Sequence, residues 1–342
     1  MHSPLRLRLD GDALVANWRL LQRLSGAAAC GAAVKADGYG LGAREVVRRL
    51  AEAGCRDFFV AMWSEARALA DLGVSVSVLH GVRDEDMADR PGTARPVLNT
   101  VAQVRRWHAA GGGACDVMVD TGMNRLGIAA QDVADGLLDG LAIEVLMSHL
   151  ACADEESPRN ESQRAGFAAL AGRTSAKRMS LANSAGIALG EGYHFDLTRP
   201  GIALYGGQQC AAHAGIRQVV TPQAQVIQRR RVRAGEVVGY NATFTATADT
   251  EVAVLNLGYA DGYLRCFSGK GGARFGGVAL PVIGRVSMDM TAIRADAAPG
   301  LAEGDWVAID YGLPETAALS GLSQYELITG LGSRFDRIWD QA

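Results

Sequence analysis

Short apolar runs alternate with helical patterns through the first two thirds of the chain, and this alternation constrains the fold more than any other feature. Strand cores are expected near residues 29–35, 57–62, 75–80, 95–98, 115–120, 143–148, 177–181 and 194–198. Helical patterns fall between most of them, at 43–53, 101–110, 133–138 and 161–171. Such alternation implies parallel strands joined by right-handed crossovers. Eight units within about 200 residues predict a TIM-like (β/α)8 barrel, because a doubly wound sheet usually stops at about five to seven strands.

The pattern changes after Tyr205, where glycine turns begin to separate strand-like runs. These runs are expected at 224–232, 236–246, 251–257, 278–282, 286–293 and 306–311, with one helix near 322–331. Local alternation with turn residues between the runs predicts a mostly antiparallel β domain. We therefore predict a barrel over residues 10–214 and a C-terminal β domain over 215–342. Within residues 1–9, leucines at 5, 7 and 9 alternate with arginines at 6 and 8, and the strand that this pattern predicts is a candidate to pack with the β domain.

Composition excludes several classes of function. The 342 residues include 34 basic and 37 acidic side chains, and the net charge of -3 gives no sign of a nucleic-acid-binding surface. The six cysteines lie far apart, without a CxxC pair or a histidine at ligand spacing, so we expect a reduced, cytoplasmic protein without a metal site. No apolar run is long enough to span a bilayer, and the N-terminus lacks the apolar core of a signal peptide.

Lys35 ends the first apolar run and is followed by a glycine-rich turn. A lysine at such a place is usually solvated, but a buried one has a lowered pKa and an amine that can form a Schiff base. In a (β/α)8 barrel the residues that follow the strands meet at one rim, where barrel enzymes place their active sites. Chemistry-bearing residues follow several of the expected strands, namely Lys35, Tyr39, Asp120, Arg125, Ser148, His149, Asn183, Ser184, Arg199, Gly201 and Ile202. This coincidence predicts an active site at the rim.

The loops after the last two expected strands contain residues that can bind a phosphate group. Ser184 can supply a hydroxyl, and Gly201 and Ile202 can supply backbone N–H groups at the start of a following helix. The loops after the seventh and eighth strands are the usual phosphate position in this architecture. Each residue taken alone is also explained as a helix cap or as part of a Pro-Gly turn. A phosphate opposite a reactive lysine suggests pyridoxal 5'-phosphate (PLP), whose aldehyde requires an amine.

A set of short motifs carries a resemblance to a known family. The motifs lie in order at 34–40, 119–127, 182–186, 199–206, 239–246, 258–263 and 284–289. With them the chain closely resembles the alanine racemases, PLP-dependent amino-acid racemases of fold-type III, over nearly its whole length. The resemblance implies an isomerase that interconverts L-alanine and D-alanine. Its product would serve as a peptidoglycan precursor, or the enzyme would feed D-alanine catabolism.

The same resemblance assigns two catalytic bases. Lys35 would bind the cofactor as an aldimine and act as the base for the D-enantiomer. Tyr240 would remove the α-proton of the L-enantiomer. Inversion requires bases on two opposite faces, since a single base tends to return the proton to the face that it left. In the family Tyr240 and Met288 reach the cofactor of the partner subunit, which implies a head-to-tail homodimer with shared active sites.

Other positions take their roles from the resemblance as well. Arg199 would face the pyridine nitrogen and leave it largely unprotonated, which limits decarboxylation and transamination. Arg125 would hydrogen-bond the phenolic oxygen of the ring and lie near the substrate carboxylate, with Met288 also at the substrate. The phosphate would be held by Tyr39, Ser184, Gly201 and Ile202, beside Asn183, while His149 would line the ring and Asp154, Tyr259 and Arg265 would form the entrance.

Two positions depart from the family pattern. Many members place a carbamylated lysine seven residues before the arginine, but Met118 stands there, so a bound anion or another acceptor would have to orient Arg125. The phosphate-binding tyrosine expected near the C-terminus is missing from 331–335, where Ser333 is the nearest candidate. Neither change affects Lys35 or Tyr240.

Four other functions are compatible with a lysine at a barrel rim. They are a racemase with broader or different amino-acid specificity, a fold-type III decarboxylase, a non-catalytic PLP carrier and a Schiff-base aldolase. Met118 keeps the first alternative open. Arg199 disfavours the decarboxylase, which normally pairs the pyridine nitrogen with a carboxylate. The long β domain that carries Tyr240 disfavours the carrier, which is a single barrel, and an aldolase would need no phosphate site.

Overall fold

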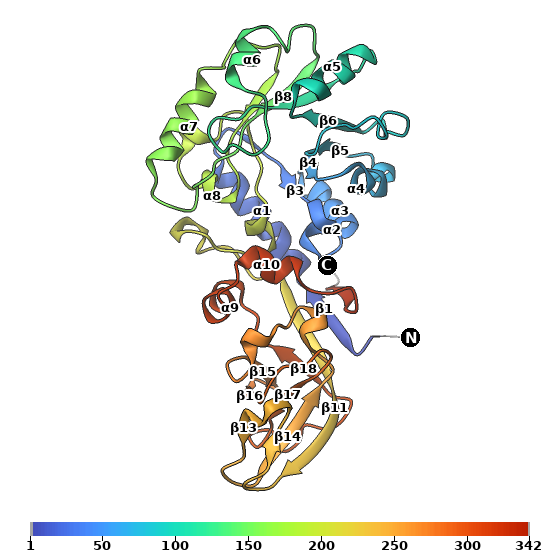
Figure 1. Ribbon diagram of the computed structural model, residues 1–342, viewed down its shortest axis with the longest axis vertical. Coiled ribbons are helices and arrows are strands. Elements are labelled where there is room, and N and C mark those ends of the chain that lie inside the picture. Colours follow the sequence, from blue (N-terminus) through green and yellow to red (C-terminus); the bar gives the residue numbers. More distant parts are fainter. Residues whose placement is uncertain (1–2, 341–342) are drawn as a thin grey trace. The chain divides into compact units, whose positions relative to one another are not determined.

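The computed structural model describes residues 3–340, which form two compact units (Figure 1). The barrel unit spans Ala13–Arg217. The β unit contains the chain up to Asp12 and again from Gln218 onward. No helix of the described residues is long and apolar enough to cross a membrane.

Parallel strands form the inside of the barrel unit. A seven-stranded sheet has the order β3-β4-β5-β6-β7-β8-β9, and β2 pairs with β10 in a second parallel sheet. Backbone hydrogen bonds link these sheets, because Asp196 N donates to Met179 O over 3.0 Å beside β9 and β10. The strands are β2 (Ala29–Cys30), β3 (Ala32–Ala33), β4 (Asp57–Val60), β5 (Ser75–Val78), β6 (Ala94–Leu98), β7 (Cys115–Met118), β8 (Ile143–Met147), β9 (Arg178–Ser180) and β10 (Leu197–Thr198). The predicted (β/α)8 barrel is confirmed.

The first barrel strand is broken at Gly31 into β2 and β3. Its first half pairs with β10, and its second half pairs with β4. Gly31 itself donates its N–H to Thr198 O over 2.9 Å. A Cβ atom at Gly31 would lie 2.8 Å from the carbonyl oxygen of Asp57, so only glycine permits this approach of neighbouring strands.

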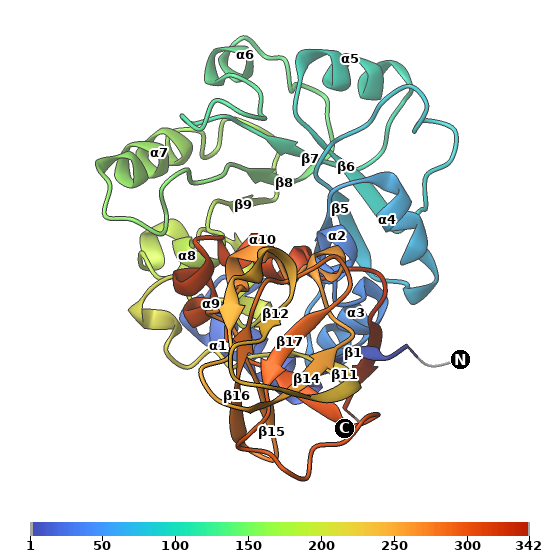
Figure 2. The same ribbon diagram turned by 60° about the horizontal axis from the view of Figure 1, so that its bottom comes forward.

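Helices surround the barrel strands, as Figure 2 shows for α4 to α7. They are α1 (Gly11–Leu24), α2 (Lys35–Tyr39), α3 (Ala43–Ala53), α4 (Trp63–Ala68), α5 (Val101–Ala109), α6 (Ala130–Ala134), α7 (Pro158–Ala168) and α8 (Ser184–Ile187). Two of them begin before the predicted ranges 133–138 and 161–171. In α7 the start is fixed by Ser157, whose Oγ accepts a hydrogen bond from Arg159 N, and by Pro158 in the first turn.

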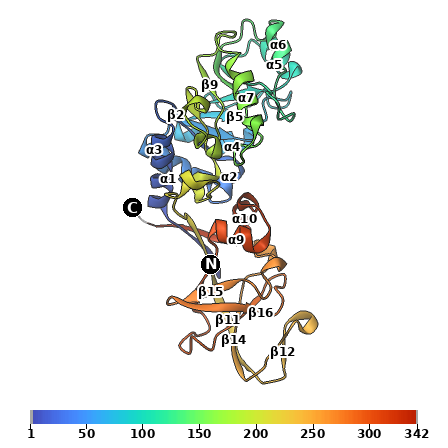
Figure 3. The same ribbon diagram turned by 90° about the vertical axis from the view of Figure 1, so that its left-hand side faces the viewer.

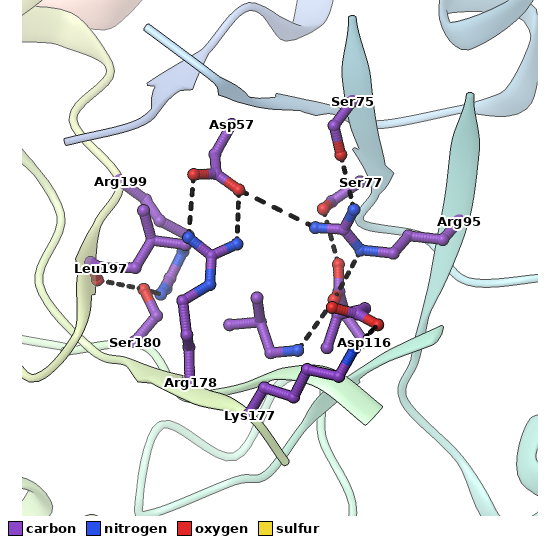
Figure 4. A network of polar contacts seen from close by, with 12 residues as sticks. Asp57, Ser75, Ser77, Arg95, Asp116, Lys177, Arg178, Ser180, Leu197 and Arg199 are labelled. Carbon is purple, nitrogen blue, oxygen red and sulfur yellow. Dashed lines mark hydrogen bonds and ion pairs between the residues drawn. The ribbon is translucent and has the colours of Figure 1, made fainter. Parts of the chain in front are cut away.

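A buried polar network occupies the amino ends of the barrel strands (Figure 4). Arg178 binds both carboxylate oxygens of Asp57, at 2.6 and 3.0 Å. The Arg95 Nε donates to Asp116 over 2.8 Å. We call this set, together with Ser75 and Ser77, which bind Arg95 and Asp116, the floor network. Since its members come from the first residues of β4, β5, β6, β7 and β9, it joins five strands at one end of the barrel.

The β unit is built around one mixed sheet. Its order is β14-β17-β16-β15-β18-β11-β1-β19, and a further β14–β11 pairing closes the strands from β14 to β11 into a barrel. All pairs are antiparallel except β1 with β19. The strands are β1 (Leu5–Leu9), β11 (Val220–Val232), β14 (Thr250–Leu255), β15 (Gly272–Phe275), β16 (Val278–Ile283), β17 (Thr291–Arg294), β18 (Trp306–Ile309) and β19 (Asp336–Trp339). The predicted antiparallel β domain is confirmed.

The predicted strand at 236–246 is wrong. The structure has a small hairpin of β12 (Val237–Val238) and β13 (Phe244–Thr245), which Figure 3 shows extending from the rest of the β unit. A 3-10 turn, Tyr240–Ala242, connects the two strands. Its Asn241 and Ala242 have φ angles of 60° and 49°, which no strand contains. Tyr240 therefore lies in a turn.

The helix predicted at 322–331 is present, but it does not close the chain as predicted, because a second helix precedes it and β19 follows it in the described residues. Helix α9 (Leu313–Ser320) ends at Gly321, whose φ of 77° is the left-handed conformation typical of a helix end. Helix α10 (Gln324–Thr329) begins after Ser323, whose side chain caps it through Glu326 N. The predicted strand at 286–293 begins only at Thr291, because Ser287 forms a turn with Met290.

Candidate active site

Lys35 follows the first barrel strand and begins α2, which is a turn of left-handed helix. Ala36, Asp37, Gly38 and Tyr39 have φ angles of 54°, 53°, 63° and 57°. For residues other than glycine this conformation costs roughly 1–2 kcal/mol each, so surrounding contacts must hold it. The sequence predicted a glycine-rich turn here but not its left-handed helical form.

Several hydrogen bonds hold this turn to the following segment. The Asp37 Oδ1 accepts from Ala43 N over 2.8 Å, and Asp37 O accepts from Gly42 N over 2.8 Å. These bonds place the end of the turn against the start of α3. The strained backbone is thus fixed by the helix that follows it.

Tyr39 lies at the far end of the turn, beside the loop that follows the eighth strand. Its ring stacks on Tyr205 with the centroids 4.6 Å apart, and the Tyr205 hydroxyl donates to Ala33 O over 2.9 Å. The Tyr39 hydroxyl faces Gly201, because a Cβ atom at Gly201 would lie 2.2 Å from it. The structure therefore brings together two predicted phosphate residues from opposite ends of the barrel sequence.

Ser184 and Ile202 lie in the same region. The Ser184 Oγ accepts hydrogen bonds from Gly201 N over 2.9 Å and from Ala203 N over 3.3 Å, so its own proton is free to be donated elsewhere. Ile202 is fully buried, and its N–H has no acceptor among residues 3–340. A buried N–H without a partner is rare and indicates a missing acceptor. These donors suit an anion such as phosphate.

Asn183 supports this group from outside. Its side-chain oxygen accepts from Gly186 N over 2.8 Å and caps α8. The capping interaction fixes the backbone on which Ser184 stands. Asn183 therefore supports the predicted phosphate site by capping α8, and its side-chain oxygen is already used in that cap.

Arg199 is a buried cation held by two acceptors. One terminal nitrogen donates to Ser180 Oγ over 2.5 Å and the other donates to Ser148 O over 2.6 Å. Its guanidinium carbon lies 5.9 Å from the centre of the Phe59 ring. Burial lowers the pKa of Arg199 to about 10, which leaves it charged near neutral pH. The sequence did not predict Ser180 as an anchor.

Lys35 and His149 lie among these positive charges. Burial lowers the pKa of Lys35, Arg125 and Arg199 lower it further, and Glu65 opposes them. Burial followed by the positive charges of Arg199, Arg125 and Lys35 lowers the pKa of His149 to about 3, so this imidazole is neutral. The environment thus favours a neutral amine at Lys35, the form that bonds to an aldehyde.

Arg125 differs from Arg199 because it is exposed. Its side chain has no hydrogen bond or ion pair within the described part of the chain. Met118, at the end of β7, is buried and carries no charge that could orient it. Asp120 accepts from Gly122 N and Met123 N and so shapes the loop, while Asp154 lies exposed in a different loop.

The β unit brings its four predicted site residues together. Tyr240, Tyr259, Arg265 and Met288 line one cavity of about 310 Å³. Tyr240 and Met288 are 68% and 54% exposed, and the guanidinium of Arg265 lies 5.0 Å from the centre of the Tyr259 ring.

Arg334 secures the segments that carry these residues, a role that sequence analysis missed. It binds both oxygens of the buried Asp261, at 2.6 and 2.7 Å, and Asp289 at 2.7 Å. Asp261 and Asp289 follow Tyr259 and Met288 closely in the chain. The neighbour of Arg334 is Ser333, the candidate for the missing tyrosine.

The residues of the barrel unit fit PLP. The fully buried Ile202 N–H lacks an acceptor, the Tyr39 hydroxyl takes the space that a side chain at Gly201 would fill, and Lys35 supplies an amine with a lowered pKa. A phosphate, a ring and an aldehyde would each find a suitable group there.

Comparisons with known proteins agree with this site. Residues 9–209 match the family model described as the alanine racemase N-terminal domain, and 219–339 match that of the C-terminal domain. Two relatives come from Agrobacterium fabrum. The catabolic alanine racemase is 41% identical, and the match covers 98% of this chain and 92% of that protein. The biosynthetic alanine racemase is 38% identical, and the match covers 98% of this chain and 93% of that protein. A crystal structure of alanine racemase from Bartonella henselae with covalently bound pyridoxal phosphate is 34% identical, covers 98% of this chain and 99% of its own, and has a TM-score of 0.89.

Proposed function

The chain belongs to the alanine racemase family of PLP-dependent isomerases, and from this premise we propose that it interconverts L-alanine and D-alanine with Lys35 and Tyr240 as two opposing bases. The observation that carries the proposal is the half-buried Lys35, whose lowered pKa gives a reactive amine beside unsatisfied phosphate donors. The chain uses PLP as its cofactor, as the Bartonella henselae relative does.

Residues of the barrel unit would hold the cofactor. Lys35 would bond to it covalently, as the amine of a PLP enzyme does. The Ser184 hydroxyl and the Ile202 N–H would donate hydrogen bonds to the phosphate. The Tyr39 hydroxyl, which lies next to Gly201, would be a third donor. When bound, PLP withdraws electrons from the α-carbon of the amino acid and so makes the α-proton more acidic.

The two bases would then move the proton between faces. The Lys35 Nζ takes the proton from, or returns it to, one face of the α-carbon, and the Tyr240 Oη does so on the other. Because neither base can serve both faces, each direction of the reaction needs both groups. Arg199 would face the ring nitrogen with its positive charge and so leave that nitrogen unprotonated, which would suppress side reactions that need a stronger electron sink.

Arg125 would bind the substrate carboxylate. Its side chain has no partner within the described residues, and Met118 offers it no charge, so the substrate itself would orient the guanidinium. Met288 would contact the substrate from the β unit, with Tyr259, Arg265 and Asp154 at the entrance and His149 beside the ring.

We propose that the active unit is a head-to-tail homodimer in which Tyr240 of one protomer serves the cofactor bound to Lys35 of the other. The high exposure of Tyr240 and Met288 supports this arrangement, since both side chains are available to a second subunit. The six free cysteines support a cytoplasmic location. Both D-alanine supply for peptidoglycan and D-alanine breakdown use this one reaction, and relatives with either name are about equally similar.

A chiral assay tests the activity and the bases together. We expect purified protein to convert L-alanine to D-alanine, to carry visible PLP absorbance, and to lose the covalent cofactor in the Lys35→Ala variant. Tyr240→Phe should retain the cofactor but lower L-to-D turnover by at least about 10²-fold. Full activity in Tyr240→Phe, or unchanged absorbance in Lys35→Ala, would refute the assignments. Faster turnover of another amino acid in the same assay would establish a broader racemase.

Mixing the two inactive variants tests the shared site. If each protomer completes the other's site, subunit exchange between Lys35→Ala and Tyr240→Phe restores one intact site per mixed dimer. The expected activity is therefore a substantial fraction of that of the unmutated protein. Verified exchange without recovery would show that each chain supplies both bases to the same site.

A further inference from the structure

Glu65 lies next to the backbone that carries Lys35, although it is far from Lys35 in sequence. It stands in the first turn of α4, and its Oε2 accepts hydrogen bonds from Ala61 N over 2.7 Å and Met62 N over 3.0 Å. Its Oε1 accepts from Ala36 N over 2.5 Å. One carboxylate thus caps a helix and binds the peptide that joins Lys35 to Ala36.

This contact anchors the strained turn at its first residue. Ala36 begins the left-handed turn with a φ of 54°, and the other end of the turn is anchored by the stack of Tyr39 on Tyr205. Asp37 fixes the middle through Ala43 N. The direction in which Lys35 leaves its strand depends on the Lys35–Ala36 peptide, which is the part that Glu65 holds.

Charge gives Glu65 a second effect on the same lysine. The charged or titratable groups that face Lys35 are Arg125 after β7, His149 after β8, Arg199 after β10 and Glu65 on α4. The two arginines favour the neutral amine, while the Glu65 carboxylate favours the ammonium. Glu65 therefore sets both where the amine lies and the pH at which it becomes reactive.

We propose that Glu65 is a positioning residue of the racemase site, whose carboxylate fixes the Lys35–Ala36 peptide in the left-handed turn and so directs the Lys35 amine toward the cofactor. The inference rests on the proposed role of Lys35 as the cofactor lysine. Glu65 itself contacts neither substrate nor cofactor. Its contribution acts through the backbone and through charge.

Three variants separate these effects. Glu65→Gln keeps the size of the side chain but removes its charge, and Glu65→Ala removes both. Glu65→Asp keeps the charge but is one methylene shorter, so it reaches Ala36 N less well. The control is Glu326→Gln, because Glu326 makes the same kind of capping interaction with Ser323 at the start of α10 without any contact to Lys35.

The first measurement uses the full chain after removal of PLP with hydroxylamine. An amine-directed acylating reagent is applied across a pH series, and the extent of Lys35 labelling is followed by peptide mass spectrometry. In Glu65→Gln the midpoint of Lys35 labelling should move to lower pH, because the carboxylate that favours the ammonium is gone. Glu65→Asp should keep the midpoint close to that of the unmutated protein.

The second measurement follows the recapture of PLP by its absorbance. We expect recapture to slow by about 10-fold or more in Glu65→Ala and Glu65→Gln, and kcat to fall while KM for alanine changes by less than about twofold. Glu326→Gln should lose thermal stability without any change in Lys35 labelling or PLP recapture.

Two results would overturn the proposal. One is an unchanged labelling midpoint with normal PLP recapture in Glu65→Gln, whatever happens to its thermal stability. The other is an equal effect in Glu326→Gln, which would reduce the role of Glu65 to helix capping. If the unmutated Lys35 fails to take up PLP at all, the proposed function fails instead, so the two failures are distinct.

Discussion

Arginine side chains have different partners at the two ends of the barrel. At the amino end, the floor network pairs Arg178 with Asp57 and Arg95 with Asp116, and each cation contacts a carboxylate directly (Figure 4). At the carboxyl-end rim, Arg199 is more deeply buried than either of these arginines but is bound by a hydroxyl and a carbonyl oxygen. The same residue type is thus neutralised at one end and left with its full charge at the other.

From this difference we infer that the amino end stabilises the fold and that the rim carries the proposed chemistry. A buried ion pair with satisfied hydrogen bonds is tolerated because each charge offsets the other. A buried cation without a counter-ion destabilises the protein but is available to an anionic or electron-rich ligand. Burial raises the pKa of Asp116, and Arg95, Ser77 and Val145 N oppose that effect, so the floor network is internally balanced. Arg199 at the rim forms no ion pair with a carboxylate of the described residues.

Removing a floor cation should give the largest effect. In Arg95→Ala, Asp116 stays buried without its partner, and breaking such a pair costs about 3–5 kcal/mol of unfolding free energy. The measurement is equilibrium denaturation of the cofactor-free protein. Arg44→Ala is the control, because Arg44 and Asp71 form a solvent-exposed pair, and such pairs contribute little to stability. A loss in Arg95→Ala no larger than in the control would abolish the distinction between the two ends.

Removing the rim cation should act on activity instead. Arg199→Gln removes the buried charge that we propose to face the cofactor nitrogen, and we expect kcat to fall by about 10²-fold or more in the chiral assay. The unfolding free energy should change by less than in Arg95→Ala, since no buried counter-ion is left unpaired. Arg199→Lys, which keeps the charge but not both hydrogen bonds, should recover part of the activity. Near-normal turnover in Arg199→Gln would contradict a chemical role for the rim.

His149 should give the smallest effect, seen in the pH dependence of stability. Its folded-state pKa of about 3 lies below the usual 6.5, so the unfolded chain binds a proton that the folded chain does not, and stability falls as pH drops below 6.5. Between pH 7 and 5 the loss due to this group is about 2 kcal/mol. His149→Gln should show a correspondingly shallower decline in denaturation of the cofactor-free protein. Parallel curves for the two proteins would show that His149 is not held neutral.

The barrel could be predicted because its pattern is local. Each buried strand appears in the sequence as a short apolar run, and each crossover helix appears as a helical spacing of apolar residues. Eight such units identify the architecture without any knowledge of contacts. The rim residues followed from this, since in a parallel barrel the residues after each strand meet at one end. Ser184, Gly201 and Ile202 were predicted at a phosphate from the loops after the last two strands, whereas Tyr39 at the phosphate and the two bases came from the family resemblance. All of these assignments remain predictions.

The details that were missed depend on distant contacts. A left-handed turn at Ala36 has no local signature, because it exists only where anchors such as Glu65 and Tyr205 hold it. Tyr240 was placed on a strand because aromatic and threonine residues around it favour strands, whereas Gly239 and Asn241 form a turn. Glu65 was not noticed since a carboxylate in the first turn of a helix usually only caps it.

The interruption of the first barrel strand at Gly31 links closure of the barrel to the position of the reactive lysine. The strand that links the two parallel sheets is also the strand that leads into Lys35, so the seam between these sheets and the reactive amine share a few residues of backbone. A chain whose seam is out of register would misdirect its lysine as well. Uptake of the coloured cofactor is therefore a report on whether the barrel has closed.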